Sequence, residues 1–200
     1  AYTITTSGRM QSAGHLDIKG NIGDGSTDND DVEAVNIGAG GVTMANSLTL
    51  NATSLTLEYD GNLDDGGMLS TLGSMDVNVN TLTLGGYKAR IVAALSASGD
   101  ANITLQNAFT NNGAVHSSDN LTFIAPAITN SNTGGFSALN ALDLQATNTD
   151  LINSGALYAG QTLKASATGN LENLAGTGTI DSDGTIELSS GATFKNTSTI

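Results

Sequence analysis

The most regular part of this chain is the segment 142–163, which reads LDLQATNTDLINSGALYAGQTL. It contains three short apolar phrases separated by polar residues, namely Leu142-Asp143-Leu144, Leu151-Ile152-Asn153 and Gly155-Ala156-Leu157. Alternation of apolar and polar residues over a few positions is typical of a short β-strand with one buried face. The first phrase begins again at Leu163, so the stretch from Leu142 to Leu163 is one unit of a repeat.

The repeat continues over residues 103–200. Its first apolar position recurs at sequence spacings of 18, 21, 21 and 23, on Ile103, Leu121, Leu142, Leu163 and Ile186. A second phrase ends in an asparagine that recurs at sequence spacings of 19, 23, 20 and 23, on Asn111, Asn130, Asn153, Asn173 and Asn196. Three short strands in about 21 residues predict one coil of a parallel β-solenoid.

Stacking explains the recurring asparagine better than a sandwich does. A sandwich needs hairpins, whose Asn-Gly and Asp-Gly turns join matched strands, whereas here such pairs recur within coils. In a solenoid, equivalent residues stack about 4.8 Å apart. The five asparagines are therefore expected to form a structural ladder of amide hydrogen bonds at one turn. We expect an all-β fold with about nine coils, at about 21 residues per coil.

The N-terminal half departs from this period. The pair Leu48-Thr49-Leu50 and Leu55-Thr56-Leu57 recurs at Met75 and Leu82, a sequence shift of 27. We therefore expect a single β-helix over 1–200, with irregular coils over 1–102 and regular coils over 103–200. The surplus residues are assigned to longer loops or short added strands that project from the rod, at Gly20–Ala34, Glu58–Thr71 and Gly85–Gly99.

Composition excludes several classes of protein. The chain of 200 residues has 6 basic and 19 acidic side chains, a formal charge of −13, no Cys and no Trp. Six cations neutralise few phosphates, so we expect no nucleic-acid partner. Without Cys there are no disulfides and no Cys-ligated metals. No apolar run reaches the length of about 18 residues that a membrane span needs, so we expect no membrane insertion.

Acidic clusters are the sharpest local motifs. Calcium prefers six to eight oxygen ligands, and one Gly/Asp-rich segment offers carboxylates at Asp24, Asp28, Asp30 and Asp31. This segment lacks the EF-hand spacing, and a solvated acidic loop is the favoured interpretation. A second cluster, with Asp60, Asp64 and Asp65, is interpreted in the same way. Either cluster is a possible contact for a partner, as are Tyr87, Lys88 and Arg90 in a predicted loop.

Catalytic signals are weak, and we expect no enzyme and no cofactor. Some β-helices act on polysaccharides with paired carboxylates. Here Asp143, Lys164 and Glu187 are expected at equivalent places on adjacent coils, but no cluster of carboxylates with Arg and aromatic residues accompanies them. The two histidines, His15 and His116, are isolated in the sequence and are interpreted as structural or solvated.

Two segments suggest a family. The segment from Leu151 to Leu163 and the segment from Asn170 to Ile180 resemble the haemagglutinin-type repeat of two-partner secretion exoproteins. These exoproteins include filamentous haemagglutinin and the contact-dependent growth inhibition toxins. The resemblance covers about residues 103–200. It implies a right-handed parallel β-helix, export through an outer-membrane transporter, a place on the bacterial cell surface, and a non-catalytic role in a surface filament.

Three functions follow as expectations. The leading one is a structural and adhesive segment of a secreted bacterial exoprotein, which extends a filament and contacts a receptor on a target cell. The alternative is a specialised receptor-binding section that uses the loops of 1–102, with an outer-membrane protein or a glycan as partner. A polysaccharide-active enzyme is a remote third. Because the repeats are cut at both ends, we expect an excised piece that associates end to end through exposed edge strands.

Overall fold

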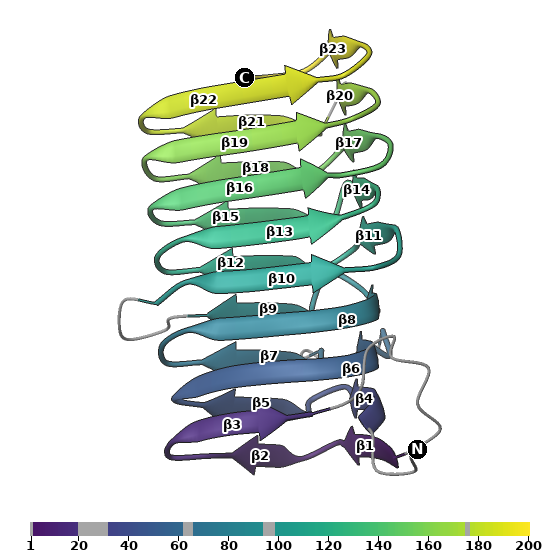
Figure 1. Ribbon diagram of the computed structural model, residues 1–200, viewed down its shortest axis with the longest axis vertical. Coiled ribbons are helices and arrows are strands. Elements are labelled where there is room, and N and C mark those ends of the chain that lie inside the picture. Colours follow the sequence, from purple (N-terminus) through teal and green to yellow (C-terminus); the bar gives the residue numbers. More distant parts are fainter. Residues whose placement is uncertain (1, 20–31, 62–65, 94–98, 175–176) are drawn as a thin grey trace.

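The chain forms a right-handed parallel β-helix, a rod of stacked windings (Figure 1). The computed structural model describes residues 2–19, 32–61, 66–93, 99–174 and 177–200. Across these residues the secondary structure consists of strands without a helix, and every strand pairing is parallel. The all-β solenoid predicted from the repeat is therefore confirmed.

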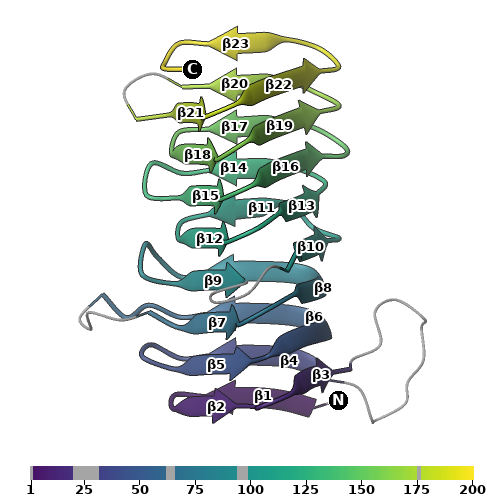
Figure 2. The same cartoon turned by 90° about the vertical axis from the view of Figure 1, so that its left-hand side faces the viewer.

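Three sheets run along the rod, each on its own face (Figure 2). Sheet A has ten strands: β1 (Tyr2–Thr6), β3 (His15–Ile18), β4 (Val32–Ile37), β6 (Ser47–Leu57), β8 (Met75–Leu84), β10 (Ala101–Leu105), β13 (Leu121–Ala125), β16 (Ala141–Ala146), β19 (Thr162–Ala167) and β22 (Thr185–Ser190). Sheet B has eight strands: β2 (Arg9–Gln11), β5 (Val42–Ala45), β7 (Met68–Thr71), β9 (Arg90–Ala93), β12 (Ala114–Ser117), β15 (Gly135–Ala138), β18 (Ala156–Ala159) and β21 (Thr179–Ser182). Sheet C has five strands: β11 (Phe109–Asn111), β14 (Ile128–Asn130), β17 (Leu151–Asn153), β20 (Leu171–Asn173) and β23 (Phe194–Asn196).

The windings of the two halves are built differently. In the C-terminal half each winding contributes one strand to each sheet, as β16, β17 and β18 do. In the N-terminal half a single long strand, β6 or β8, replaces the separate strands of sheets A and C. The structure has about seven turns instead of the nine expected. One reason is that the N-terminal windings are longer, since Leu48 pairs with Met75, 27 residues further along the chain. The other reason is that the first and last windings are incomplete.

The predicted stacking of the first apolar position is confirmed from Leu121 onward. Leu121 pairs with Leu142, Leu142 with Leu163 and Leu163 with Ile186. The assignment of Ile103 to this column is wrong, because Ala101 pairs with Leu121 and Ile103 lies beside Phe123. The error is a shift of two residues, which leaves the side chains on the same face of the strand and is therefore invisible to the alternation of apolar and polar residues.

The core is a thin column of aliphatic side chains with one aromatic cluster. Leu142, Leu144 and Leu163 are almost completely buried, as are their counterparts in other windings. Near the middle of the rod, the ring centroid of Phe123 lies 4.9 Å from that of Phe109 and 5.0 Å from that of Phe136. The column is less covered at the C-terminal end, where the side chain of Phe194 is 47 % exposed.

Strand register locates an insertion between β3 and β4. Leu16 pairs with Leu48, a sequence step of 32, whereas Val35 pairs with Leu55, a step of only 20. The strands β3 and β4 thus lie beside the two halves of β6. The two steps differ by 12, so the chain between β3 and β4 is 12 residues longer than the matching part of β6. This surplus lies within Gly20–Ala34, one of the three stretches predicted to hold extra residues.

The other two stretches are not simply projections. Glu58–Thr71 contains β7 and Gly85–Gly99 contains β9, and both strands belong to sheet B within the rod. The prediction that these strands project from the rod is therefore wrong. They were hard to recognise in the sequence because their alternation of apolar and polar residues is short. In β7 it is also interrupted, since Leu69, Ser70 and Thr71 are all buried. Each winding of the N-terminal half therefore keeps a sheet B strand, like the regular windings.

Candidate functional site

The five predicted asparagines lie in one column and bond directly to one another. Asn111 Nδ2 donates to Asn130 Oδ1 over 2.9 Å, and Asn130 Nδ2 donates to Asn153 Oδ1 over 2.8 Å. The chain of amides continues to Asn173 over 2.8 Å and to Asn196 over 2.9 Å. We call this column the asparagine ladder. The first four members are buried, so their amide groups find hydrogen-bond partners in one another and in nearby backbone oxygens.

The ladder also fixes the turn between sheets C and B. Asn153 Nδ2 makes a second hydrogen bond, of 3.0 Å, to the backbone oxygen of Thr179 on the next winding. A glycine follows the ladder residue in four of the windings, at Gly113, Gly134, Gly155 and Gly178. A Cβ atom on Gly155 would lie 2.7 Å from Asn130 Nδ2 and would overlap the backbone oxygen of Gly134. The turn after Asn153 therefore has no room for a side chain at Gly155.

A second ladder was missed in the sequence. Asn120 Nδ2 donates to Asp100 Oδ1 over 2.7 Å, and Asn140 Nδ2 donates to Asn120 Oδ1 over 2.8 Å. These residues precede the sheet A strands β10, β13 and β16 at a constant sequence spacing of 20. Each of these residues stands directly before an apolar phrase, and this regular position could have predicted the ladder. Asn and Asp are so frequent in this chain that the regularity was not apparent.

Both histidines contact a serine on the following winding. His15 Nδ1 lies 2.9 Å from Ser47 Oγ, and His116 Nδ1 lies 2.9 Å from Ser137 Oγ. The half-buried His116 also lies 3.5 Å, through Nε2, from Ser118 Oγ. Burial lowers the pKa of His116, because the charged imidazolium loses hydration there. These pairs link neighbouring windings.

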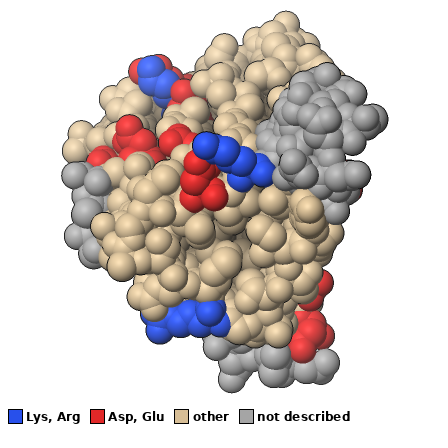
Figure 3. Space-filling model, turned by 60° about the horizontal axis from the view of Figure 1, so that its bottom comes forward, with Lys and Arg blue, Asp and Glu red and all other residues tan. Residues whose placement is uncertain are grey.

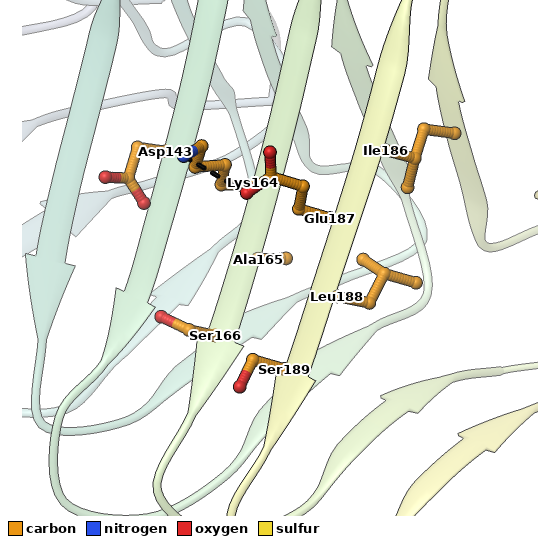
Figure 4. Close-up of a pocket in the computed structure, with 8 residues that line it drawn as sticks. All are labelled: Asp143, Lys164, Ala165, Ser166, Ile186, Glu187, Leu188 and Ser189. Atoms are coloured by element: carbon orange, nitrogen blue, oxygen red, sulfur yellow. Dashed lines mark ion pairs between the residues drawn. The ribbon is translucent and has the colours of Figure 1, made fainter.

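The outward face of sheet A carries the charged residues expected on adjacent coils. Asp143 pairs in register with Lys164, and Lys164 with Glu187. Lys164 Nζ lies 3.1 Å from Glu187 Oε2, the ion pair drawn in Figure 4. The three side chains border a depression of about 600 Å³ near the C-terminal end. Because Lys164 stands between the two carboxylates, the arrangement is a ladder of alternating charge, which favours neighbouring windings by a small amount.

Among the predicted contact residues, Tyr87 and Lys88 lie just before strand β9 of sheet B. Tyr87 is exposed, and its ring packs edge-on against that of Tyr59 at 5.2 Å between centroids. Lys88 Nζ lies 5.4 Å from the centroid of the Tyr87 ring. Arg90 was expected in the same loop, but it begins strand β9. The loop therefore ends at the buried Ala89, well before the Gly99 bound expected for this stretch.

The acidic clusters lie mostly beyond the part of the chain that the structure describes. This applies to Asp24, Asp28, Asp30 and Asp31, and to Asp64 and Asp65, whereas Asp60 is described and exposed. Within the described ranges, no group of three or more His, Asp or Glu side chains is placed to hold a metal ion. The same ranges contain no helix long and apolar enough to cross a bilayer.

Charged side chains are sparse on the described surface. Figure 3, which brings the N-terminal end of the rod forward, shows acidic and basic groups as small separate clusters among uncharged residues. No protein-family model, curated protein or solved structure matches the chain. A functional proposal therefore depends on the geometry of the rod and on the residues of its faces.

Proposed function

We propose that this chain is a structural and adhesive segment of a secreted bacterial surface exoprotein, in which it extends a filament toward a target cell. The observation that carries the proposal is the uninterrupted parallel register from β10 to β22, with the asparagine ladder running beside it. Each winding is hydrogen-bonded to the windings before and after it, so the rod grows longer by the addition of similar units. The same contacts make the rod resist bending. The resemblance of residues 103–200 to haemagglutinin-type repeats supports the same role.

Stiffness is the first property to test. The chain has no Cys, so Ser7→Cys and Ser189→Cys provide unique sites for a donor and an acceptor dye at exposed positions near opposite ends. With a rise of about 4.8 Å per winding, the two sites are separated along the axis by about 35 Å. A rigid segment is expected to give one narrow distribution of single-molecule energy-transfer efficiency up to the unfolding transition. A broad distribution in native buffer contradicts the structural role.

Adhesion is tested separately with intact cells. The fluorophore-labelled chain is expected to bind bacterial or epithelial cells saturably in flow cytometry, and an excess of unlabelled chain is expected to compete. Absence of saturable binding to every cell type tested contradicts the adhesive part of the proposal but leaves the structural part intact.

The alternative, a receptor-binding section within 1–102, is favoured by one observation. The insertion between β3 and β4 adds residues that the register of the rod does not use. A variant that lacks residues 20–31 is expected to keep the rod, so its cell binding separates the two hypotheses. If binding disappears while the fold remains, the insertion contains the receptor contact. If binding is unchanged, the faces of the rod provide it.

A further inference from the structure

Three of the six cations of this acidic protein form no ion pair with any residue that the structure describes. Lys19 pairs with Asp17, Lys164 with Glu187 and Lys195 with Glu172. The others are Arg9, Lys88 and Arg90, which have no carboxylate within 4.0 Å among those residues. Their contacts are uncharged, since Arg9 Nη2 lies 3.8 Å from Met44 Sδ and Lys88 lies over the Tyr87 ring. All three residues lie on the sheet B side of the N-terminal half.

Strand register arranges the two arginines at opposite ends of a column. Arg9 pairs with Val42, Val42 with Met68, and Met68 with Arg90. At about 4.8 Å per winding, the backbones of the two arginines are about 14 Å apart along the axis. Val42 and Met68 point outward between them and are half-buried. The column therefore presents a positive charge, two aliphatic side chains and a second positive charge, in that order.

A shallow depression follows the same column. It has a volume of about 230 Å³ and is lined by Gly40, Val42, Gly66, Met68, Lys88 and Arg90. Gly40 adopts a left-handed backbone conformation with φ of 74°, which glycine tolerates without strain. At Gly66 a Cβ atom would lie 2.5 Å from the backbone carbon of Lys88. Gly66 thus allows the next winding to stack closely, and the space beside Gly40 is open, so a ligand backbone can approach the aliphatic floor from that side.

We propose that this column, from Arg9 to Arg90 with Lys88 beside it, docks an acidic, extended segment of a protein partner. Carboxylates of the partner pair with the two guanidinium groups, and an apolar side chain between them covers Val42 and Met68. Guanidinium groups match carboxylates in bidentate geometry, and methionine adapts to varied apolar side chains. A peptide fits better than a glycan, because the two side chains between the arginines, Val42 and Met68, are aliphatic and match an apolar side chain of a peptide.

The test uses a labelled peptide and the intact chain. The probe is the fluorescein-labelled peptide Gly-Asp-Asp-Leu-Val-Leu-Asp-Asp-Gly, whose two inner aspartates are about 14 Å apart when extended at about 3.4 Å per residue. Fluorescence anisotropy is expected to show saturable binding, weakened at least tenfold in Arg9→Gln and Arg90→Gln. Met68→Ser is expected to weaken binding severalfold. Lys195→Gln, which removes an exposed cation on sheet C, is the matched control and is expected to bind like the original chain.

Three results would overturn the proposal. Equal binding of a peptide with Asn in place of every Asp would remove the role of charge. Equal loss in Lys195→Gln and Arg90→Gln would show attraction to the protein as a whole instead of this column. Tighter binding of alginate, with displacement of the peptide, would assign the column to an acidic glycan. Circular dichroism spectra and thermal midpoints of each variant establish that a loss of binding does not reflect unfolding.

Discussion

At the scale of single residues, the asparagine ladder is the place where one side chain contributes most to the stability of the rod. Asn153 accepts a hydrogen bond from Asn130, donates one to Asn173 and donates another to the backbone oxygen of Thr179. It is fully buried, so no water replaces these bonds when the amide is removed. The ladder thus combines local turn geometry with cohesion between windings.

Asn153→Ala is expected to destabilise the rod strongly. Each buried group left without a partner costs about 1–3 kcal/mol, and the substitution affects both neighbouring asparagines. The free energy of unfolding, measured by urea titration, should fall by at least about 2 kcal/mol. The exposed Asn148, in the same winding, provides the control Asn148→Ala, which should change stability by less than about 0.5 kcal/mol. Similar losses in the two variants would contradict a special role for the ladder.

His116 should make stability depend on pH. Its pKa is lowered in the folded chain by burial, so the unfolded chain takes up a proton more readily. Stability is therefore fully present above the ordinary pKa of about 6.5 and is lost as the pH falls below it toward the folded value. The urea midpoint of the original chain should decrease between pH 7.5 and 5.5. In His116→Gln the decrease should be smaller, and an unchanged decrease would exclude this histidine as its source.

At the scale of elements, the insertion between β3 and β4 should be dispensable for folding. Deletion of residues 20–31 leaves as many positions between Ile18 and Val35 as lie between Leu50 and Leu55 in β6. Strands β3 and β4 then match β6 in length. The variant should keep its circular dichroism spectrum and lose no more than a few degrees in thermal midpoint.

The matched control is a deletion of equal length elsewhere in the same half. Deletion of residues 60–71 includes β7, which pairs with both β5 and β9. Loss of this strand interrupts sheet B, so the control should unfold at a much lower temperature or fail to fold. Equal stability of the two deletions would show that strand register does not identify the insertion.

At the scale of the whole molecule, the rod should tolerate removal of complete windings. Leu121, Leu142 and Leu163 stack on successive windings, so deletion of residues 121–162 places Leu163 directly over Ala101. The shortened chain should fold and lose about 10 Å of length, at about 4.8 Å per winding. Small-angle X-ray scattering measures the change in maximum dimension.

A deletion shorter by one residue supplies the control. Removal of 121–161 shifts the following strand by one position, and its apolar side chains then point to solvent. This variant should aggregate or remain unfolded, although it retains one residue more than the first deletion. If both deletions fold equally well, stacking in register does not hold the rod together.

The sequence alone determined the solenoid, because its stacking partners are chemically alike and lie at nearly constant spacing. Asn130, Asn153 and Asn173 were placed in one column from spacing alone, and they bond directly in the structure. The prediction was weaker where the repeat is irregular. Ile103 was shifted by two residues, and β7 and β9 were assigned to projections, because a short strand beside glycines has too few side chains to reveal its partner.

Only the tertiary structure decided which distant residues share a face. Arg9 and Arg90 are far apart in the sequence and become ends of one column through the register of four sheet B strands. The N-terminal windings differ in length, so no fixed sequence spacing links these arginines. That they have no carboxylate partner among the described residues is also a property of the folded chain, because it depends on where the acidic side chains lie. Local alternation determines that a strand forms, whereas winding length determines what lies beside it.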